Sequence, residues 1–530
     1  MTMKKRVLII GLDGFTWRLG RDLMSEGVMG NLANLVNKGT NGILWSVMPF
    51  ETSPAWSSFQ TGCLPGKTSI FAFHRYDRSL KKLSLNSFAD NAMPSLWELL
   101  DRAGRRAISL NMPVSSPPPK VNGIIIPGLL CPKLSPETVH PPEAYNKYIK
   151  PRRNYLIVNN DIRNTIRDLT EQSLMTERAR LEVSLNLLKD NSWDVFCVQM
   201  QSSDLMQHRS WWALDRTARG HRKEQRTEAL EFYRFCDDAI GRLMEAAGQD
   251  VMTLIVSDHG FCGRKGTVSV NVWLRQHGYL HLLDKKETPW ETTKRRIPPL
   301  KALARLYGNV RRATRKRGST PVFGMVDLAH MRKLIDFERT RAFCLGGMAG
   351  IFYINGSPAQ RGELAQKLKR ELLDELGPES STPVIARIYS GVEIYGPTAN
   401  NDILPDLVLE YVEGYESRRS PVGDTVVSEE ALLELPQGTH ARDGVFAIYG
   451  PGIKSGITSE ADIVDMLPTV LAYLGIPIPR HVDGKVLSKV FDEPPSVQYE
   501  DITRDNSLST EYTDEEQARV EDQLSGLGYL

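Results

Sequence analysis

The sequence predicts an α/β fold in which a mostly parallel central sheet is covered by helices on both faces and carries one inserted cap. The first observation is that apolar runs typical of buried strands alternate with segments of helical periodicity. The second is that three largely apolar runs, in MKKRVLIIGLDG, DVFCVQMQSSD and VMTLIVSDHG, each lead to an acidic residue. Ligands bind at the carboxyl ends of strands in such sheets, so these acids mark the predicted site.

Three acids and two histidines follow these runs: Asp13, Asp204, His208, Asp258 and His259. Three carboxylates gathered in one cleft without a counter-charge would repel one another and be desolvated, which raises their pKa values. A bound divalent cation removes this conflict. Carboxylate oxygens together with neutral imidazoles suit zinc best, with manganese or iron as alternatives.

The first elements lead to a candidate anion site. Residues 14–39 are predicted to form a helix and a turn that pack against the sheet. Residues 42–77 combine a short strand with two turns, and Thr52 lies in the sequence TSPAW, where a helix begins near Pro54. A hydroxyl beside the first free amides of a helix suits an anion. The alternative is that Thr52 or Ser53 is only the N-cap of that helix.

The middle of the chain continues the alternation of helix and strand. The predicted elements are a helix and strand at 94–113, a proline-rich loop at 114–120, a strand at 123–127 and helices at 170–191 and 226–248. The last two helices precede the strands that lead to Asp204 and Asp258. This order is the one expected of a doubly covered parallel sheet.

Residues 285–340 interrupt this pattern and are predicted to form a basic cap or lid. Residues 285–317 hold twelve Lys or Arg against two acids, and three prolines interrupt any long helix. One hypothesis is a solvated insertion. The other is that the segment steers an anionic substrate, a membrane headgroup or a polymer toward the cleft.

The core is expected to resume at residue 341 and to extend to 490. A strand is predicted at 341–355, a helix at 361–376, a strand at 406–411 and a helix at 461–474. His440 lies in a glycine-flanked loop before the apolar strand 445–449, and by itself it is typical of a surface residue. Residues 491–530 carry eleven acids against two arginines, which predicts a loose acidic tail ending in a short helix at 513–524.

Composition indicates a soluble cytoplasmic enzyme. The 530 residues are 41% apolar, and no 18-residue apolar stretch is present. The six scattered cysteines predict reduced, buried thiols, and the short basic and apolar start does not fit a signal peptide. The net charge of +2 gives no global attraction to nucleic acid or membrane.

Five motifs in order resemble the alkaline phosphatase superfamily: GLDG, TSPAW, DLMQH, SDHG and GTHARDGVFAIYGPGI. They are most similar to the type I phosphodiesterase/nucleotide pyrophosphatase branch and its predicted phosphohydrolase/phosphomutase group, over about residues 5–490. The resemblance implies an alkaline-phosphatase-like core and two metal ions. Asp13, Thr52, Asp258 and His259 match the ligands of one metal, and Asp204, His208 and His440 match those of the second.

The resemblance also implies a mechanism in which Thr52 attacks phosphorus and forms a phospho-threonine intermediate that water then releases. The sulfatase motif is missing at Thr52, so sulfate ester hydrolysis is not expected. Phe73 stands where nucleotide pyrophosphatases carry an asparagine that contacts a phosphoryl oxygen. Lys67 or Arg75 is the candidate for supplying that contact with the substrate.

Three functions follow as expectations. The first is a two-metal phosphohydrolase acting on a phosphodiester or a nucleotide-, sugar- or lipid-linked phosphate, with no specific nucleic acid partner. The second is a phosphomutase that uses the same site. The third is a non-catalytic, metal-binding member of the fold.

Overall fold

The fold is built on one eight-stranded sheet in the computed structural model, which describes residues 4–159, 165–218, 221–283, 331, 334–396, 400–429, 437–504 and 511–527. The strand order is β19-β2-β18-β8-β1-β7-β5-β6. The strands are β1 (Val7–Leu12), β2 (Thr40–Trp45), β5 (Ala107–Met112), β6 (Gly123–Pro127), β7 (Val195–Met200), β8 (Met252–Val256), β18 (Asp443–Tyr449) and β19 (Ile457–Asp462). Only β18 runs antiparallel to its neighbours, so the predicted mostly parallel sheet is confirmed.

The central strand β1 fixes where the candidate site lies. It pairs in parallel with β7 on one side and β8 on the other, with Leu12 opposite Met200 and Gly11 opposite Val256. The three strands are buried throughout, as their largely apolar sequences indicate. Because the three strands end at the same edge, the polar residues that follow them meet there.

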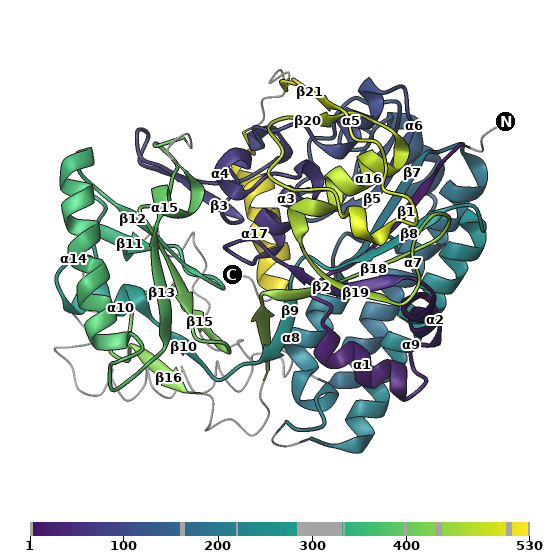
Figure 1. The fold of residues 1–530 in the computed structure, drawn as a ribbon. Helices are drawn as coiled ribbons and strands as arrows, with labels where there is room; N and C mark the ends of the chain where they lie inside the picture. The colour runs from purple at the N-terminus through teal and green to yellow at the C-terminus, as the bar shows by residue number, and fades with distance from the viewer. Residues whose placement is uncertain are drawn as a thin grey trace.

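Alternate residues of β1 support two helical layers (Figure 1). Leu8 and Ile10 belong to the apolar cluster that includes helices α1 (Trp17–Ser25), α2 (Gly30–Lys38), α7 (Ile166–Asp190) and α9 (Lys223–Ala247). Val7 and Ile9 belong to the cluster of α3 (Thr52–Thr61), α5 (Leu96–Arg102) and α16 (Met466–Leu474). The helix predicted at 461–474 begins only at Met466, because the residues up to Asp462 form strand β19 and pair with β2.

A smaller lobe, at the left of Figure 1, contains most of the elements between the two parts of the main sheet. Its four-stranded antiparallel sheet has the order β11-β12-β14-β13. The elements are β11 (Ala342–Cys344), β12 (Gly350–Ile354), α14 (Pro358–Leu376), β13 (Ile385–Ser390), α15 (Gly391–Tyr395) and β14 (Leu407–Tyr411). A three-stranded sheet, β15-β10-β16, joins β10 (Gly266–Val268) to β15 (Tyr415–Ser417) and β16 (Val427–Glu429), and α10 (Val270–Gln276) follows β10.

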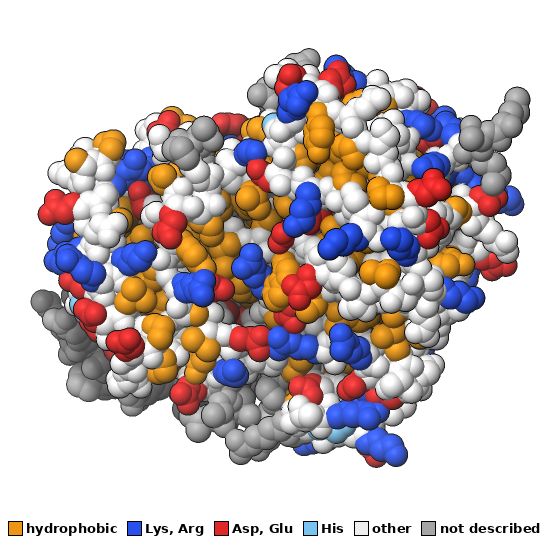
Figure 2. Space-filling view, in the orientation of Figure 1, with side chains coloured by type: hydrophobic (Ala, Val, Ile, Leu, Met, Phe, Trp, Pro, Cys, Tyr) orange, Lys and Arg blue, Asp and Glu red, His pale blue; other side chains and the backbone are white. Residues whose placement is uncertain are grey.

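The predicted division of the chain did not separate this lobe from the core. Residues 341–490 were assigned to the core as a whole, but the main sheet takes only β18 and β19 from that range. Most of the predicted basic cap, residues 285–340, lies outside the described residues. On the face shown in Figure 2, basic and acidic side chains are interspersed.

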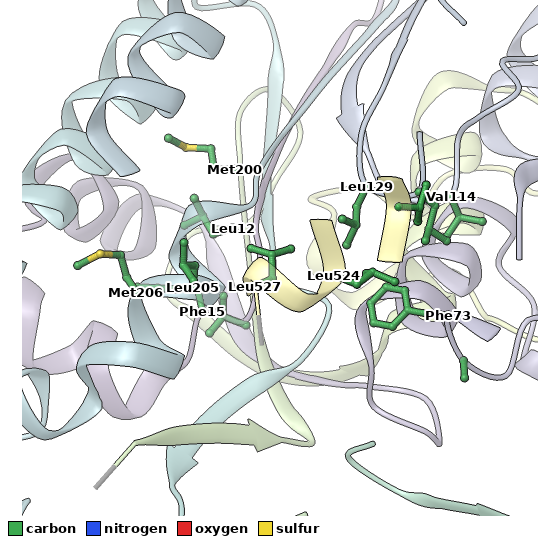
Figure 3. Close-up of a cluster of buried hydrophobic side chains, with 14 of the residues drawn as sticks. Leu12, Phe15, Phe73, Val114, Leu129, Met200, Leu205, Met206, Leu524 and Leu527 are labelled. Carbon is green, nitrogen blue, oxygen red and sulfur yellow. The ribbon is translucent and has the colours of Figure 1, made fainter. Parts of the chain in front are cut away.

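The C-terminal helix α17 (Asp514–Leu527) packs against the core, which corrects the prediction of a loose tail. Val520, Leu524 and Leu527 are fully buried. Figure 3 shows Leu524 beside Phe73, and Leu527 near Leu12 and Leu205. The spacing of the three apolar residues places them on one helix face. In the sequence this apolar face is difficult to recognise, because acidic residues surround the three positions.

Two further expectations concern membranes and thiols. Within the described ranges, no helix has the length and apolar character needed to cross a membrane. All six cysteines are buried and none forms a disulfide, as the sequence predicted.

The remaining elements include α4 (Pro65–Thr68), β3 (His74–Asp77), β4 (Lys82–Leu85), α6 (Pro142–Ala144), α8 (Ser202–Leu214), β9 (Gly260–Gly263), β17 (Gly438–Ala441), β20 (Ile478–Pro479) and β21 (Tyr499–Glu500). The strands among them form three two-stranded sheets, β17-β9, β20-β21 and β3-β4.

Candidate metal centre and active site

The ends of the central strands bring six of the predicted residues into two groups. One group is Asp13, Asp258 and His259, and the other is Asp204, His208 and His440. Within each group the possible ligand atoms lie within 4.8 Å of one another. All six residues are buried, with His208 the most exposed at 9%. The resemblance implies the same two sets, with Thr52 added to the first, and their role as metal ligands stays a prediction.

In the first group, each carboxylate has one oxygen held by the protein and one directed at the histidine. Asp13 Oδ2 accepts hydrogen bonds from Trp56 Nε1 at 2.8 Å and Gln199 Nε2 at 2.6 Å. Asp258 Oδ1 accepts one from the Gly14 amide at 3.1 Å. His259 Nε2 lies 3.8 Å from Asp13 Oδ1 and 3.3 Å from Asp258 Oδ2. These last three atoms are buried and have no hydrogen-bond partner among the described residues.

In the second group, two imidazoles meet over one carboxylate. His440 Nε2 lies 3.2 Å from Asp204 Oδ1, and His208 Nε2 lies 3.5 Å from the same oxygen. The two Nε2 atoms are 3.0 Å apart. Asp204 and His208 are separated by four residues on α8, so one helix face presents both.

The backbone sets the tautomer of all three histidines. Each Nδ1 faces a carbonyl oxygen, which can only accept, so Nδ1 must carry the proton. The acceptors are Gly438 for His208 at 3.1 Å, Gly260 for His259 at 3.2 Å and Phe50 for His440 at 3.1 Å. In its neutral form each ring then presents the lone pair of Nε2 to its group, which is the arrangement that a metal ion needs.

Burial and charge shift the pKa values of these groups in a consistent pattern. Burial, with the charges of the other two acids, raises the pKa of Asp13 well above its ordinary value. Burial raises the pKa of Asp258 to about 8, and the charge of Asp204 adds to the rise. Burial lowers the pKa of His208 to about 4 and that of His259 well below its ordinary value. The protein alone therefore disfavours ionising the first pair of acids, whereas a cation would favour it.

In the second group, the imidazoles already compensate part of the charge of the Asp204 carboxylate. Burial raises the pKa of Asp204, but the imidazoles of His208 and His440 outweigh it and lower the pKa overall. Burial lowers the pKa of His440, but its contact with Asp204 outweighs that effect and raises the pKa. The donor set of the two groups, three carboxylates and three neutral imidazoles, fits two divalent cations, and zinc is the ion that such a set suits best.

Thr52 lies in a segment that contacts both groups. It is the first residue of α3 and is fully buried. Phe50, two residues before it, accepts from His440, and Trp56, one helical turn after it, donates to Asp13. The N-cap of α3 is Glu51, so the alternative that Thr52 or Ser53 is only an N-cap is wrong. The segment that carries Thr52 is thus tied to both groups.

Comparison with known proteins identifies the family. The family model described as type I phosphodiesterase/nucleotide pyrophosphatase matches residues 7–441. The chain belongs to the type I phosphodiesterase/nucleotide pyrophosphatase family. This membership confirms the resemblance and makes the protein a hydrolase of phosphate esters, in a family whose activity depends on metal ions.

Solved structures show the same fold. Human ectonucleotide pyrophosphatase/phosphodiesterase 5 matches with a TM-score of 0.55 and 12% identity, over 92% of this chain and 100% of that chain. An inactive variant of the murine protein, solved in complex with AMP, matches with a TM-score of 0.50 and 12% identity, over 93% of this chain and 98% of that chain. A search of curated proteins finds no significant match.

The two basic residues suggested for substrate binding contact residues outside the two groups. Lys67 Nζ donates to Asp483 Oδ1 at 2.6 Å and to the carbonyl of His481 at 2.7 Å. Arg75 forms an ion pair with Asp90. Their role in binding substrate stays a prediction that these contacts do not support.

Sequence reasoning missed the residues that orient Asp13. Trp56 and Gln199 both donate to its Oδ2, and Asn111 Nδ2 in turn donates to Gln199 Oε1 at 2.8 Å. A signal was present, because Gln199 is a polar residue in the otherwise apolar strand β7, and such a residue needs a buried partner.

Gly14 is a further residue whose role was not evident from the sequence. Its φ of +65° is one that residues with a side chain rarely adopt. An added Cβ would lie 2.6 Å from the Phe261 ring and 3.2 Å from Asp204 Oδ1. The glycine therefore lets the end of β1 approach the second group closely.

Proposed function

We propose that the protein hydrolyses a phosphodiester with Thr52 as its nucleophile, at a site that holds two divalent cations. The observation that carries the proposal is the pair of buried three-residue groups, each of which is contacted by the segment that begins α3. Asp13, Asp258 and His259 would hold one cation together with the Thr52 hydroxyl. Asp204, His208 and His440 would hold the other.

When bound, such cations neutralise the carboxylates, favour ionisation of a hydroxyl and polarise the phosphoryl oxygens. Zinc is the proposed metal, because three imidazole nitrogens and carboxylate oxygens suit it, and manganese is the alternative. Trp56 and Gln199 hold Asp13 Oδ2 and so leave Oδ1 as its ligand atom. The Nδ1–H donations to backbone carbonyls leave the three Nε2 atoms for the same purpose.

The chain's own residues then perform the two chemical steps. Thr52 Oγ1 loses its proton and forms a bond to phosphorus, the bond from phosphorus to the leaving alcohol oxygen breaks, and that oxygen takes up a proton. Water next attacks phosphorus, the bond from phosphorus to Thr52 Oγ1 breaks, and Oγ1 takes up a proton from that water, whose oxygen stays on phosphorus. The side chain of Glu51 does not cap α3, and its Oε1 instead accepts from the Met348 amide at 2.8 Å. The first amides of α3 thus have no side-chain cap and suit a phosphoryl oxygen.

The proposal extends to the substrate class and the compartment. A phosphodiester is the substrate class that the family supports, with a nucleotide, a sugar or a lipid as the group attached. Phe73 is 2% exposed and lies beside Leu524, so an apolar surface stands where the relatives' asparagine was expected (Figure 3). The six buried, unpaired thiols support a reducing, cytoplasmic location.

The test is hydrolysis of a chromogenic phosphodiester and of its matching monoester by zinc- or manganese-loaded protein. Thr52→Ala removes the nucleophile, and Thr52→Ser is the matched control because it keeps a hydroxyl. The proposal expects diester turnover that Thr52→Ala abolishes and Thr52→Ser retains in part. Diester turnover that is equal in native protein and Thr52→Ala would refute the role of Thr52. Transfer of the phosphoryl group to another position on the substrate, without its release to water, would favour a phosphomutase instead.

A further inference from the structure

The short strand β17 positions two of the three residues in the second group. His440 belongs to β17, and the carbonyl of Gly438 in the same strand accepts the Nδ1 proton of His208 at 3.1 Å. The strand pairs with β9, where His440 lies opposite Phe261. A shift of β17 would therefore move one candidate ligand and the acceptor that orients another.

Glu416 reaches β17 from the smaller lobe. It lies in β15 and is 5% exposed. Its Oε2 accepts a hydrogen bond from Thr439 Oγ1 at 2.5 Å, and its Oε1 accepts from Arg264 Nη1 at 2.8 Å. Arg264 also donates through Nη2 to Gln437 Oε1 at 3.0 Å. Both carboxylate oxygens are thus engaged, and both contacts hold the segment around β17.

The charge state of Glu416 makes the direction of these hydrogen bonds clear. Burial raises its pKa, but the Arg264 guanidinium and the Thr439 hydroxyl outweigh burial and hold the pKa below its ordinary value. An ionised carboxylate can only accept, so the Thr439 hydroxyl donates. Hydrogen bonds to an ionised acceptor are about twice as strong as those between neutral groups.

We propose that Glu416 is a positioning residue for the second cation, acting through Thr439 on β17. Thr439 stands between Gly438 and His440, so fixing its side chain fixes the carbonyl that orients His208 and the ring of His440 together. The inference rests on the proposed two-cation site. Its consequence is that the smaller lobe, which supplies Glu416, sets the geometry of the second group.

Thr439→Val is the variant that isolates this role, because it removes the hydroxyl and keeps the shape. Thr439→Ser is its matched control, because it keeps the hydroxyl. Full-length, metal-free protein is titrated with zinc in competition with a chromogenic chelator, and the two dissociation constants are compared. Loss of a partner that orients a metal ligand lowers affinity by about 10- to 100-fold. We expect a loss of that size at one site in Thr439→Val, an unchanged second site, and near-native binding in Thr439→Ser.

A second pair of variants tests Glu416 itself. Glu416→Gln removes the negative charge that Arg264 Nη1 contacts at 2.8 Å and is expected to weaken the same single site. Glu410→Gln is the control in the same lobe, where Glu410 accepts from the Tyr389 hydroxyl at 2.8 Å. It should leave both sites unchanged. If Thr439→Val does not fold, this pair decides by the same criterion.

The outcomes separate the inference from the function on which it rests. Two native-like sites in Thr439→Val, each within twofold of the native constants, would overturn the role of Glu416 and Thr439. Equal weakening of both sites would also overturn it, because that result indicates general loosening of the fold. Native protein that lacks two zinc sites would instead refute the proposed two-cation function.

Discussion

The metal-free protein is predicted to lose stability as the pH rises from 7 to 8. Asp258 is fully buried and its pKa is raised to about 8, mainly by burial, whereas an aspartate in the unfolded chain ionises near pH 3.9. At pH 7 the folded state therefore binds nearly one more proton than the unfolded state, and at pH 8 about half a proton more. A raised carboxyl pKa destabilises the fold progressively as the pH rises from the unfolded value to the folded one.

The magnitude follows from this difference in bound protons. One proton changes the free energy of unfolding by about 1.4 kcal/mol per pH unit, so Asp258 alone should cost about 1 kcal/mol between pH 7 and 8. Asp13, whose pKa is also raised well above its ordinary value, acts in the same direction. His208 and His259, with lowered pKa values, are neutral in the folded state. In the unfolded chain these two histidines are already mostly deprotonated at pH 7, so their opposing effect on the free energy of unfolding between pH 7 and 8 is small.

The assay is guanidinium unfolding of chelator-treated protein at pH 7.0, 7.5 and 8.0. Asp258→Asn is the matched variant, because its amide oxygen can still accept from the Gly14 amide but the side chain cannot ionise. It should show a flatter pH dependence and a higher unfolding midpoint than native protein at pH 8. A native midpoint that is constant or rises with pH would refute the reasoning, as would an Asp258→Asn variant that keeps the native slope.

Three further substitutions test the packing around the site. Trp56→Phe removes the Nε1 donor at 2.8 Å from Asp13 and should weaken zinc binding at one site by about 10- to 100-fold, measured by chelator competition; unchanged affinity would contradict this. Leu524→Ala should lower the free energy of unfolding by about 2–5 kcal/mol, because this side chain is fully buried. Leu80→Ala is the control: Leu80 is 67% exposed, and its substitution should change the free energy of unfolding by less than about 0.5 kcal/mol. Equal effects of the two substitutions would show that α17 does not dock. Gly14→Ala places a Cβ 2.6 Å from the Phe261 ring at positive φ and should destabilise the protein by at least about 1 kcal/mol in a denaturant titration, so native-like stability would contradict the close approach.

The central sheet could be predicted because its strands have a simple sequence signature. A strand buried on both faces needs a largely apolar sequence, and β1, β7 and β8 have one. Parallel strands also end at a common edge, so the acids that follow could be expected to converge. The same reasoning did not reveal the smaller lobe, whose antiparallel strands are short and leave weaker patterns.

The candidate site was predictable only in part from the residues alone. His440 was interpreted as typical of a surface loop, yet it lies in β17, and only the family motifs indicated its role. Pairing between β17 and β9 joins segments about 180 residues apart, which no local pattern reveals. The partners of Asp13 were missed for the same reason, since Trp56 and Gln199 approach it from distant parts of the chain.

The C-terminal segment shows how composition can mislead. Its acidic character predicted a loose tail, but the apolar stripe of α17 is buried against the core. Three well-spaced apolar residues suffice to dock a helix when a complementary apolar surface exists, and that surface is formed by residues remote in sequence. Phe73 and Leu205 are part of it, as Figure 3 shows.

The measurement that tests the central claim most directly is anomalous diffraction at the zinc absorption edge from crystals of zinc-loaded protein. The account predicts two peaks for each chain, one between Asp13, Asp258 and His259 and the other between Asp204, His208 and His440. A single peak, or peaks elsewhere in the molecule, would contradict the proposed two-cation site.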